Sequence, residues 1–232
     1  MKKSLFFIAS VFLSVSQLSG QITMPGVKWS DSYSFDRCNI MKIDFFAKNN
    51  ELMRTFNYKT FYTSGGKNFM VIMDAPAKGS DITTIFDLAN EVAIQIMGSD
   101  SPEPMYNATR FKYPEGADIK KLELKPTEET RTIVGHLCKK FTYTYKSIFG
   151  SVWITDEVKL SNDTGIFRAA KMSALHNTLS IEGFVMEMTS EDSRGGKTVM
   201  TTVTLDKSEN KTIDLPRAKM GTSMNKVSYY TF

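Results

Sequence analysis

The chain has little of what most catalytic and metal-binding sites are made from. Its 232 residues include only two cysteines, Cys38 and Cys138, and two histidines, His136 and His176. These four side chains are scattered along the sequence and lack the spacing of zinc ligands. His136 and Cys138 share one face of an expected strand, but no third residue is placed to orient the imidazole. The sequence therefore predicts no metal site, no cofactor and no catalytic residue, with a hydrolase acting through Cys138 as a remote alternative.

The sequence also lacks long apolar runs; its one clear apolar run is short and lies at the start. Lys2 and Lys3 precede the apolar segment Leu5–Val15, and the small residues Ser19 and Gly20 follow it. This order is typical of a secretory signal peptide over residues 1–20. The alternative is an uncleaved membrane anchor, but the run is short for a bilayer. We expect export to the periplasm or the cell exterior, with no transmembrane segment in the mature chain.

Charge of one sign is not in excess. The formal net charge of +4 comes from 29 basic and 25 acidic residues, and two of the lysines belong to the predicted signal peptide. A nucleic-acid partner would require basic residues clustered on one surface. No such cluster occurs in the sequence, so nucleic acid is not an expected partner.

The two cysteines leave two readings open. In an oxidising compartment, Cys38 and Cys138 can form one disulfide, which would stabilise the fold by about 4 kcal/mol in the chain-entropy model. They can equally be two free thiols buried in separate strands, since cysteine packs as a small apolar side chain.

Alternating aromatic residues are the strongest feature present. Within the stretch Thr127–Leu160, the side chains of Phe141, Tyr143 and Tyr145 fall on one face of a strand. This period of two is typical of a half-buried antiparallel strand. We expect a break around Gly150 and Ser151 and a second strand beginning at Val152.

The rest of the chain is predicted to continue as hairpins. Strands are expected over Ser34–Phe46, Glu51–Thr63, Asn68–Asp74, Asp81–Leu88, Glu91–Met97, Ile181–Asp192 and Thr198–Lys207. Paired glycines at Gly65-Gly66 and Gly195-Gly196 favour tight turns between neighbouring strands. A helix over Ile82–Met97 is the alternative to its hairpin, but the β-branched residues favour strands.

Two segments are expected to differ from this pattern. Gly98–Gly116 carries three prolines and is predicted to be a loop over one end of the sheet, or a domain boundary. Ile166–Thr178 is the best helix candidate, capped by Asp163 or Thr164. The fold class is therefore mainly β with some helix (α+β): residues 21–232 form a single domain, a strongly curved antiparallel half-barrel with one or two covering helices.

A resemblance supports this outline. The segment Gly135–Phe141, followed by Val152-Trp153-Ile154-Thr155, resembles the central motif of a group of exported bacterial proteins of unknown function. These are similar in outline to the lipoprotein carriers and receptors of the LolA/LolB type. The segment Phe184–Leu205 looks like the closing strands of that family. The resemblance implies a half-barrel around an apolar cavity with a helical lid, although His136 stands where an aromatic residue is usual.

Aromatic and methionine side chains are the candidates for lining such a cavity. They are Phe56, Tyr58, Phe141, Tyr143, Tyr145, Trp153, Met186 and Met188. Thioethers and aromatic rings suit pockets for flexible apolar ligands, but they also fill ordinary cores. The first hypothesis is a non-enzymatic envelope protein that holds a lipid or other apolar ligand. The alternative is a structural or interaction module with a filled core, bound to another envelope protein.

Overall fold

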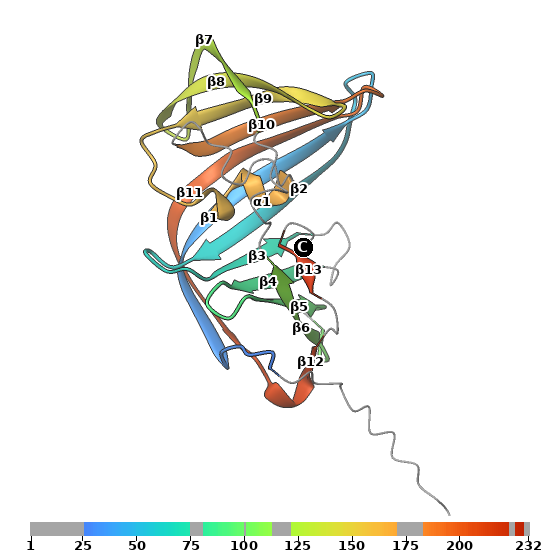
Figure 1. The fold of residues 1–232 in the computed structure, drawn as a ribbon, viewed down its shortest axis with the longest axis vertical. Coiled ribbons are helices and arrows are strands. Elements are labelled where there is room, and N and C mark those ends of the chain that lie inside the picture. The colour runs from blue at the N-terminus through green and yellow to red at the C-terminus, as the bar shows by residue number, and fades with distance from the viewer. Residues whose placement is uncertain are drawn as a thin grey trace, which may run out of the picture.

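A computed structural model shows a strongly curved sheet with little helix (Figure 1). It describes residues 26–74, 81–99, 101–112, 122–170, 183–222 and 226–229. The predicted signal peptide lies outside these residues. The mainly β fold class and the curved antiparallel sheet are confirmed.

The strands follow one another as a meander on either side of the single described α-helix. The first group is β1 (Ser32–Phe46), β2 (Leu52–Tyr62), β3 (Phe69–Met73), β4 (Ile82–Asp87), β5 (Val92–Met97) and β6 (Met105–Lys112). The second is β7 (Leu124–Ile133), β8 (His136–Tyr145) and β9 (Ile148–Thr155). After η2 (Asn162–Thr164) and α1 (Ile166–Ala170) come β10 (Phe184–Asp192), β11 (Lys197–Asp214), η4 (Arg217–Lys219), β12 (Met220–Thr222) and β13 (Val227–Ser228).

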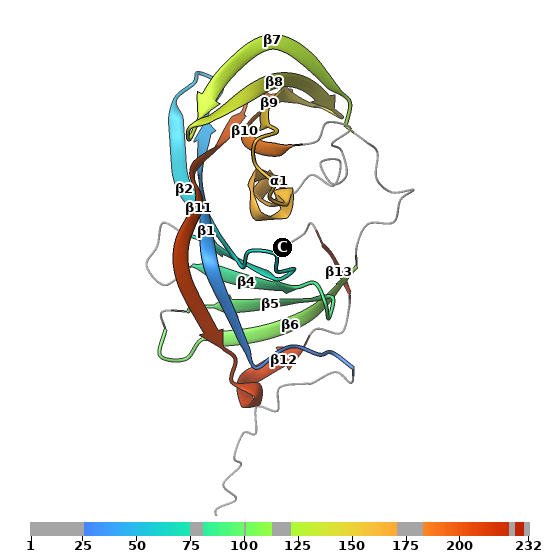
Figure 2. The ribbon, with the colours of Figure 1, turned by 90° about the vertical axis from the view of Figure 1, so that its left-hand side faces the viewer.

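The long strands β1 and β11 pair antiparallel at the centre of the sheet. The strand order is β12-β6-β5-β4-β3-β2-β1-β11-β10-β9-β8-β7, and β13 also pairs with β6. Figure 2 shows the sheet bent into a C, with β7–β10 at one end, β3–β6 at the other and α1 inside the bend. Most sequence-adjacent strands are neighbours, as short connections favour. The exceptions include β6 and β7, which lie near opposite ends of the order, and β12, which pairs with β6 instead of β11.

The end of the sheet formed by β3–β6 is tied back to the centre. The chain leaves β11, turns through η4 and places β12 parallel to β6, with Met220 opposite Tyr106. One face of these strands therefore meets the beginning of β1 and the end of β11. We call the residues buried there the basal cluster: Tyr33, Phe35, Cys38, Phe61, Met70, Ile85, Val92, Ile94, Ile96, Ala108, Leu215 and Met220.

The concave face of the sheet carries the larger core. We call it the inner cluster: Met41, Ile43, Tyr58, Tyr62, Phe69, Val71, Phe86, Ala93, Phe111, Leu122, Phe141, Tyr143, Val152, Ile154, Ile166, Phe167, Val185, Met188, Met200 and Tyr229. A third, outer cluster lies on the other face of β7–β10 and consists of Ile133, Cys138, Trp153, Phe184 and Met186.

The hairpin predictions are confirmed at most positions. The segment over residues 81–97 forms the antiparallel pair β4–β5, not a helix. The predicted face shared by Phe141, Tyr143 and Tyr145 is also confirmed, since all three belong to or pack on the inner cluster.

Two predicted breaks are wrong. The expected loop Gly98–Gly116 contains β6, because Ala108 and Phe111 are buried and give this segment a core face. The expected break at Gly150 lies inside β9, and the turn occurs at Lys146 and Ser147 instead. A β-carbon on Gly150 would lie 1.9 Å from the Thr189 carbonyl oxygen, so this glycine permits a close approach of β10 rather than a turn.

The predicted helix over residues 166–178 is described only at its start. Its first turn is α1, and residues 171–182 lie outside the described part of the chain. Before it, the Ser161 side chain accepts a hydrogen bond from the Asp163 backbone N–H at the start of η2. None of the described helices is long and apolar enough to cross a membrane.

Candidate ligand cavity on the concave face

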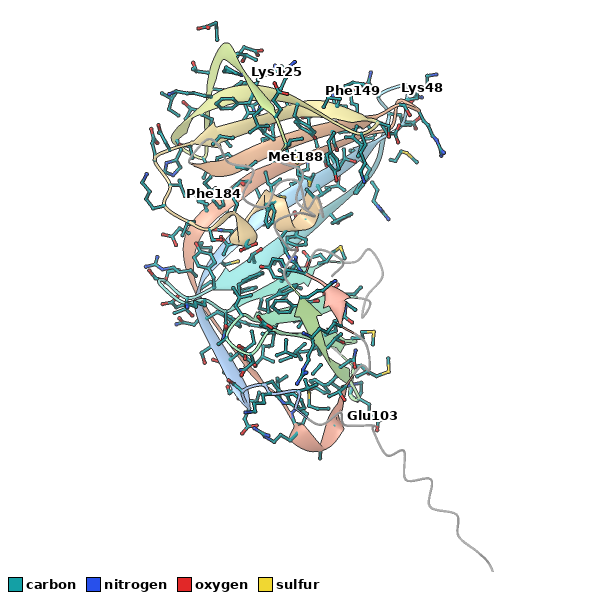
Figure 3. All side chains as sticks on the ribbon, viewed as in Figure 1. Lys48, Glu103, Lys125, Phe149, Phe184 and Met188 are labelled. Atoms are coloured by element: carbon teal, nitrogen blue, oxygen red, sulfur yellow. The ribbon has the colours of Figure 1, made fainter. Side chains whose placement is uncertain are left out.

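A cavity of about 450 Å³ lies between the concave face of the sheet and α1. It is within the range of small-molecule sites in proteins. Figure 3 shows the side chains that surround the region where α1 sits in the bend. The described lining residues are Ile43, Phe45, Phe56, Tyr58, Val71, Met73, Ile82, Thr84, Phe86, Gln95, Ala169, Ala170, Ser190, Thr198 and Met200.

The lining is mainly apolar, and none of these described residues carries a formal charge. The polar members, Thr84, Gln95, Ser190 and Thr198, offer hydroxyl and amide groups. Such a wall favours an apolar ligand and provides a few hydrogen-bonding positions.

Strand alternation explains how the wall is assembled. On β1 the side chains of Ile43 and Phe45 point to the concave face, and on β2 those of Phe56 and Tyr58 do so. Ile43 lies directly opposite Phe56 and Met200 in the two neighbouring ladders. Since directly opposed residues share a face of a sheet, three strands contribute one continuous apolar surface.

Tyr58 brings a phenol into this wall. It is only 7% exposed. Burial raises the pKa of the Tyr58 phenol well above its ordinary value, and the nearby positive charge of Arg168 opposes that rise. The phenol is therefore neutral at physiological pH and can serve only as a neutral hydrogen-bonding group.

Arg168 holds α1 against the side of the cavity formed by β4. Its guanidinium carbon lies 4.0 Å from the ring centroid of Phe86 and 4.1 Å from that of Tyr229. Stacking of this kind is attractive because the ring faces carry negative charge density. The helix is thereby fixed to β4 and to the segment after β13, which positions Ala169 and Ala170 in the cavity wall.

At another side of the cavity, two aromatic rings meet under an arginine. The Phe45 and Phe56 ring centroids are 5.4 Å apart. The guanidinium carbon of Arg54 lies 4.9 Å from the first centroid and 5.4 Å from the second. Arg54 is exposed, so this corner is a rim between the apolar wall and solvent.

Two of the predicted site residues, Phe56 and Tyr58, line the cavity. Phe141, Tyr143 and Met188 belong to the same inner cluster, and Tyr145 packs on it, but none of the four lines the cavity. Figure 3 marks Met188 on β10. These side chains extend the concave apolar face towards β7.

Trp153 and Met186 lie on the opposite face, in the outer cluster. Met186 and Met188 are two residues apart and would share a face in a regular strand. A bulge in the pairing between Val185 and Glu187 breaks that alternation, so Val185 and Met188 point inward and Met186 points outward. Neither Trp153 nor Met186 can line the same cavity as Phe56.

Several lining residues had a weaker sequence signal. Phe45 shares the strand pattern of Ile43 and could have been selected from it. Thr84, Gln95 and Ala170 could not, because polar and small residues on strands and helices carry no sign of a cavity. They are found only when the sheet brings β4, β5 and α1 together.

Of the two readings left open for the cysteines, the structure has the second: Cys38 and Cys138 are two free, buried thiols. They lie on β1 and β8, which are four steps apart in the strand order. At about 4.8 Å per step, the separation is about 19 Å, whereas bonded cysteines have Cα atoms about 4.4–6.8 Å apart.

The imidazole of His136 does not activate Cys138. Its Nδ1 lies 3.1 Å from Oε2 of Glu157, and the Cys138 thiol donates to the His136 carbonyl oxygen at 3.4 Å. Burial raises the pKa of the Cys138 thiol, which disfavours the nucleophilic thiolate. Among the described residues, no group of three or more His, Cys, Asp and Glu side chains is placed to hold a metal ion.

Comparisons with known proteins give little beyond this geometry. No model of a known protein family and no curated protein matches the chain. Two solved structures of PNGF-II, in the C2 and P21 space groups, each share 15% sequence identity with it, with TM-scores of 0.41 and 0.40. They cover 81% and 84% of this chain, which spans only 31% and 32% of theirs. The expected resemblance to the LolA/LolB type therefore stays a prediction from the sequence.

Proposed function

We propose that this protein is a non-enzymatic binding protein of the cell envelope that holds an apolar ligand in the concave cavity. The observation that carries the proposal is the cavity itself: about 450 Å³, with no formally charged side chain among its described lining residues. An empty apolar space of this size would leave its walls without contacts on one side. A bound lipid or similar molecule would supply them.

The residue types of the wall suit a flexible ligand. Met73 and Met200 contribute thioether side chains that adapt to irregular shapes, and Phe45, Phe56 and Phe86 provide large apolar surfaces. The signal-like segment at residues 1–20 supports export to the periplasm or the cell exterior. Both features agree with a carrier or sensor of an apolar molecule outside the cytoplasm.

The first test is native mass spectrometry of the chain purified from its own host, followed by extraction with organic solvent. A co-purifying lipid-sized mass would support the proposal and identify the cargo. A bare polypeptide that also takes up no apolar fluorescent dye would contradict it. That result would favour the structural or interaction module, whose partner is another envelope protein.

A pair of variants ties the binding to the cavity. Ala170→Phe places a ring in the cavity wall and should reduce dye or lipid binding at least tenfold, because the space would be filled. Val203→Phe adds the same ring at a position that is 46% exposed and outside the cavity wall, and serves as the control. Equal binding by the two variants would place the ligand elsewhere.

A further inference from the structure

The rim of the cavity at Arg54 differs from the rest of its wall. Arg54 lies directly opposite Phe45 in the β1–β2 ladder and two residues before Phe56 on β2. Since both of these rings line the cavity, strand alternation places Arg54 on the same concave face. The guanidinium is therefore the charged end of an apolar wall.

Stacking leaves the hydrogen-bonding edge of Arg54 available. The guanidinium lies over the two rings at 4.9 and 5.4 Å from their centroids. A guanidinium carries its N–H donors in its plane, and contact with ring faces does not require them. This arrangement fixes the side chain and leaves a planar fork of donors that matches a carboxylate or phosphate.

No carboxylate of the described residues forms an ion pair with Arg54. Asp44 precedes Phe45 in the sequence. Its carboxylate binds Lys42 Nζ at 2.8 Å and accepts a hydrogen bond from Thr55 Oγ1 at 2.6 Å. Asp44 and Thr55 alternate with Phe45 and Arg54 along their strands and so occupy the other face of the sheet. The positive charge at the rim is not neutralised from there.

Hydroxyl groups continue the same row across the sheet. Phe45 lies opposite Thr198 on β11, and Thr198 lies opposite Ser190 on β10. Both hydroxyl residues line the cavity. The polar positions at this end can donate hydrogen bonds to an anionic group, whereas the wall formed by Ile43, Val71 and Met73 can contact only apolar atoms.

We propose that the ligand is an anionic amphiphile: its alkyl chain fills the cavity, and its carboxylate or phosphate head is bound by Arg54 at the rim. This inference rests on the proposed binding function and adds the chemical class of the ligand. A neutral or cationic amphiphile would leave the rim charge unmatched.

The test compares three probes that share a twelve-carbon chain: dodecanoate, dodecyl phosphate and dodecanol. Binding is measured by displacement of an apolar dye at pH 8 and low salt, where carboxylate and phosphate are ionised. We expect at least one anionic probe to bind about fivefold tighter than dodecanol, the upper end for a solvent-accessible ion pair. The preferred anionic probe distinguishes a carboxylate head from a phosphate head.

The variant Arg54→Gln should abolish that preference. The matched control is Lys59→Gln on the same strand, which removes the same charge from a side chain paired with Asp74 at 3.4 Å. Lys59 lies an odd number of residues from Arg54, on the other face of the strand. The control should retain the full anion preference.

The other outcomes separate the two proposals. Equal binding of all three probes, or an unchanged preference in Arg54→Gln, overturns the head-group inference and leaves the apolar cavity in place. Failure of every probe to bind overturns the binding function and the inference together. Thermal unfolding of both variants checks that they are folded, which we expect because Arg54 and Lys59 are not buried.

Discussion

The two ends of the sheet bury their strands in different ways. In β4 and β5 nearly every residue is buried, because the inner cluster covers one face and the basal cluster the other. In β7 most residues are exposed, and β8 alternates between buried and exposed positions. The first end resembles the middle of a covered sheet, and we call it the two-sided end. The second is half-solvated, and we call it the one-sided end.

The cavity lies where these two kinds of packing meet. Its wall takes Thr84, Phe86 and Gln95 from the two-sided end and Ser190, Thr198 and Met200 from the strands that lead to the one-sided end. The closely packed basal cluster holds β4 and β5, and these two strands form one wall of the cavity. Side chains of β1, β2 and α1 border the remaining space of about 450 Å³ without filling it.

The largest expected effect compares the two ends directly. Ile85→Ala, at a fully buried position in the basal cluster, should lower the free energy of unfolding by about 2–5 kcal/mol, since it leaves a cavity in a closely packed core. Leu137→Ala on β8, where the side chain is 51% exposed, should change it by less than about 0.5 kcal/mol. Urea unfolding measures both. Similar losses would mean that the ends do not differ in packing.

The second prediction uses the buried thiol of the basal cluster. Burial raises the pKa of the Cys38 thiol to about 11, above the ordinary range of a free thiol. Folding therefore favours the protonated thiol, and this contribution to stability is complete below pH 9 and is lost as the pH rises towards 11. Its upper limit is about 2–3 kcal/mol, at 1.36 kcal/mol per pKa unit.

The measurement is urea unfolding at pH 8, 9, 10 and 11 for the parent chain and Cys38→Ala. The parent should lose more stability than the variant across this range, because tyrosine ionisation affects both equally. Cys138→Ala in the outer cluster should shift the curve in the same direction, because burial also raises the pKa of the Cys138 thiol. Parallel curves for the parent and Cys38→Ala would contradict the prediction.

The third prediction concerns the one-sided end. Gly150→Ala would bring a methyl group to 1.9 Å from the Thr189 carbonyl oxygen, so the backbones of β9 and β10 would have to separate. We expect a loss of about 1–3 kcal/mol, typical of overpacking. Ser151→Ala, one residue along the same strand, is the control and should cost less than about 0.5 kcal/mol. A Gly150→Ala protein as stable as its control would show that the two strands separate easily.

Gly150 also shows where sequence reasoning reached its limit. Local patterns predicted the hairpins and the aromatic face of β8, because side-chain alternation and turn residues act over a few positions. A glycine that permits a close approach by another strand looks the same in sequence as a glycine in a turn. The contact with Thr189 joins residues far apart in the chain, so no local pattern contains it.

The candidate site was less accessible to prediction than the fold. Of the candidate lining residues, Phe56 and Tyr58 line the cavity, whereas Trp153 and Met186 lie on the opposite face of the sheet. For Met186 the physical reason is the bulge in the pairing of β9 with β10, which shifts the alternation by one residue. Bulges depend on how two strands fit together. The lining residues Ala170 and Gln95 likewise depend on the approach of α1 to the sheet.

The smallest effect is expected at His136, at the exposed start of β8. Its imidazole Nδ1 and the Glu157 carboxylate are 3.1 Å apart, and both side chains are partly open to solvent. His136→Gln should change the free energy of unfolding by less than about 0.5 kcal/mol, because water and salt screen such pairs. Glu157→Gln should behave alike, and the double variant should equal the sum of the two. A loss above 1 kcal/mol from His136→Gln would show that this half-solvated end depends on specific polar contacts, as the two-sided end depends on apolar packing.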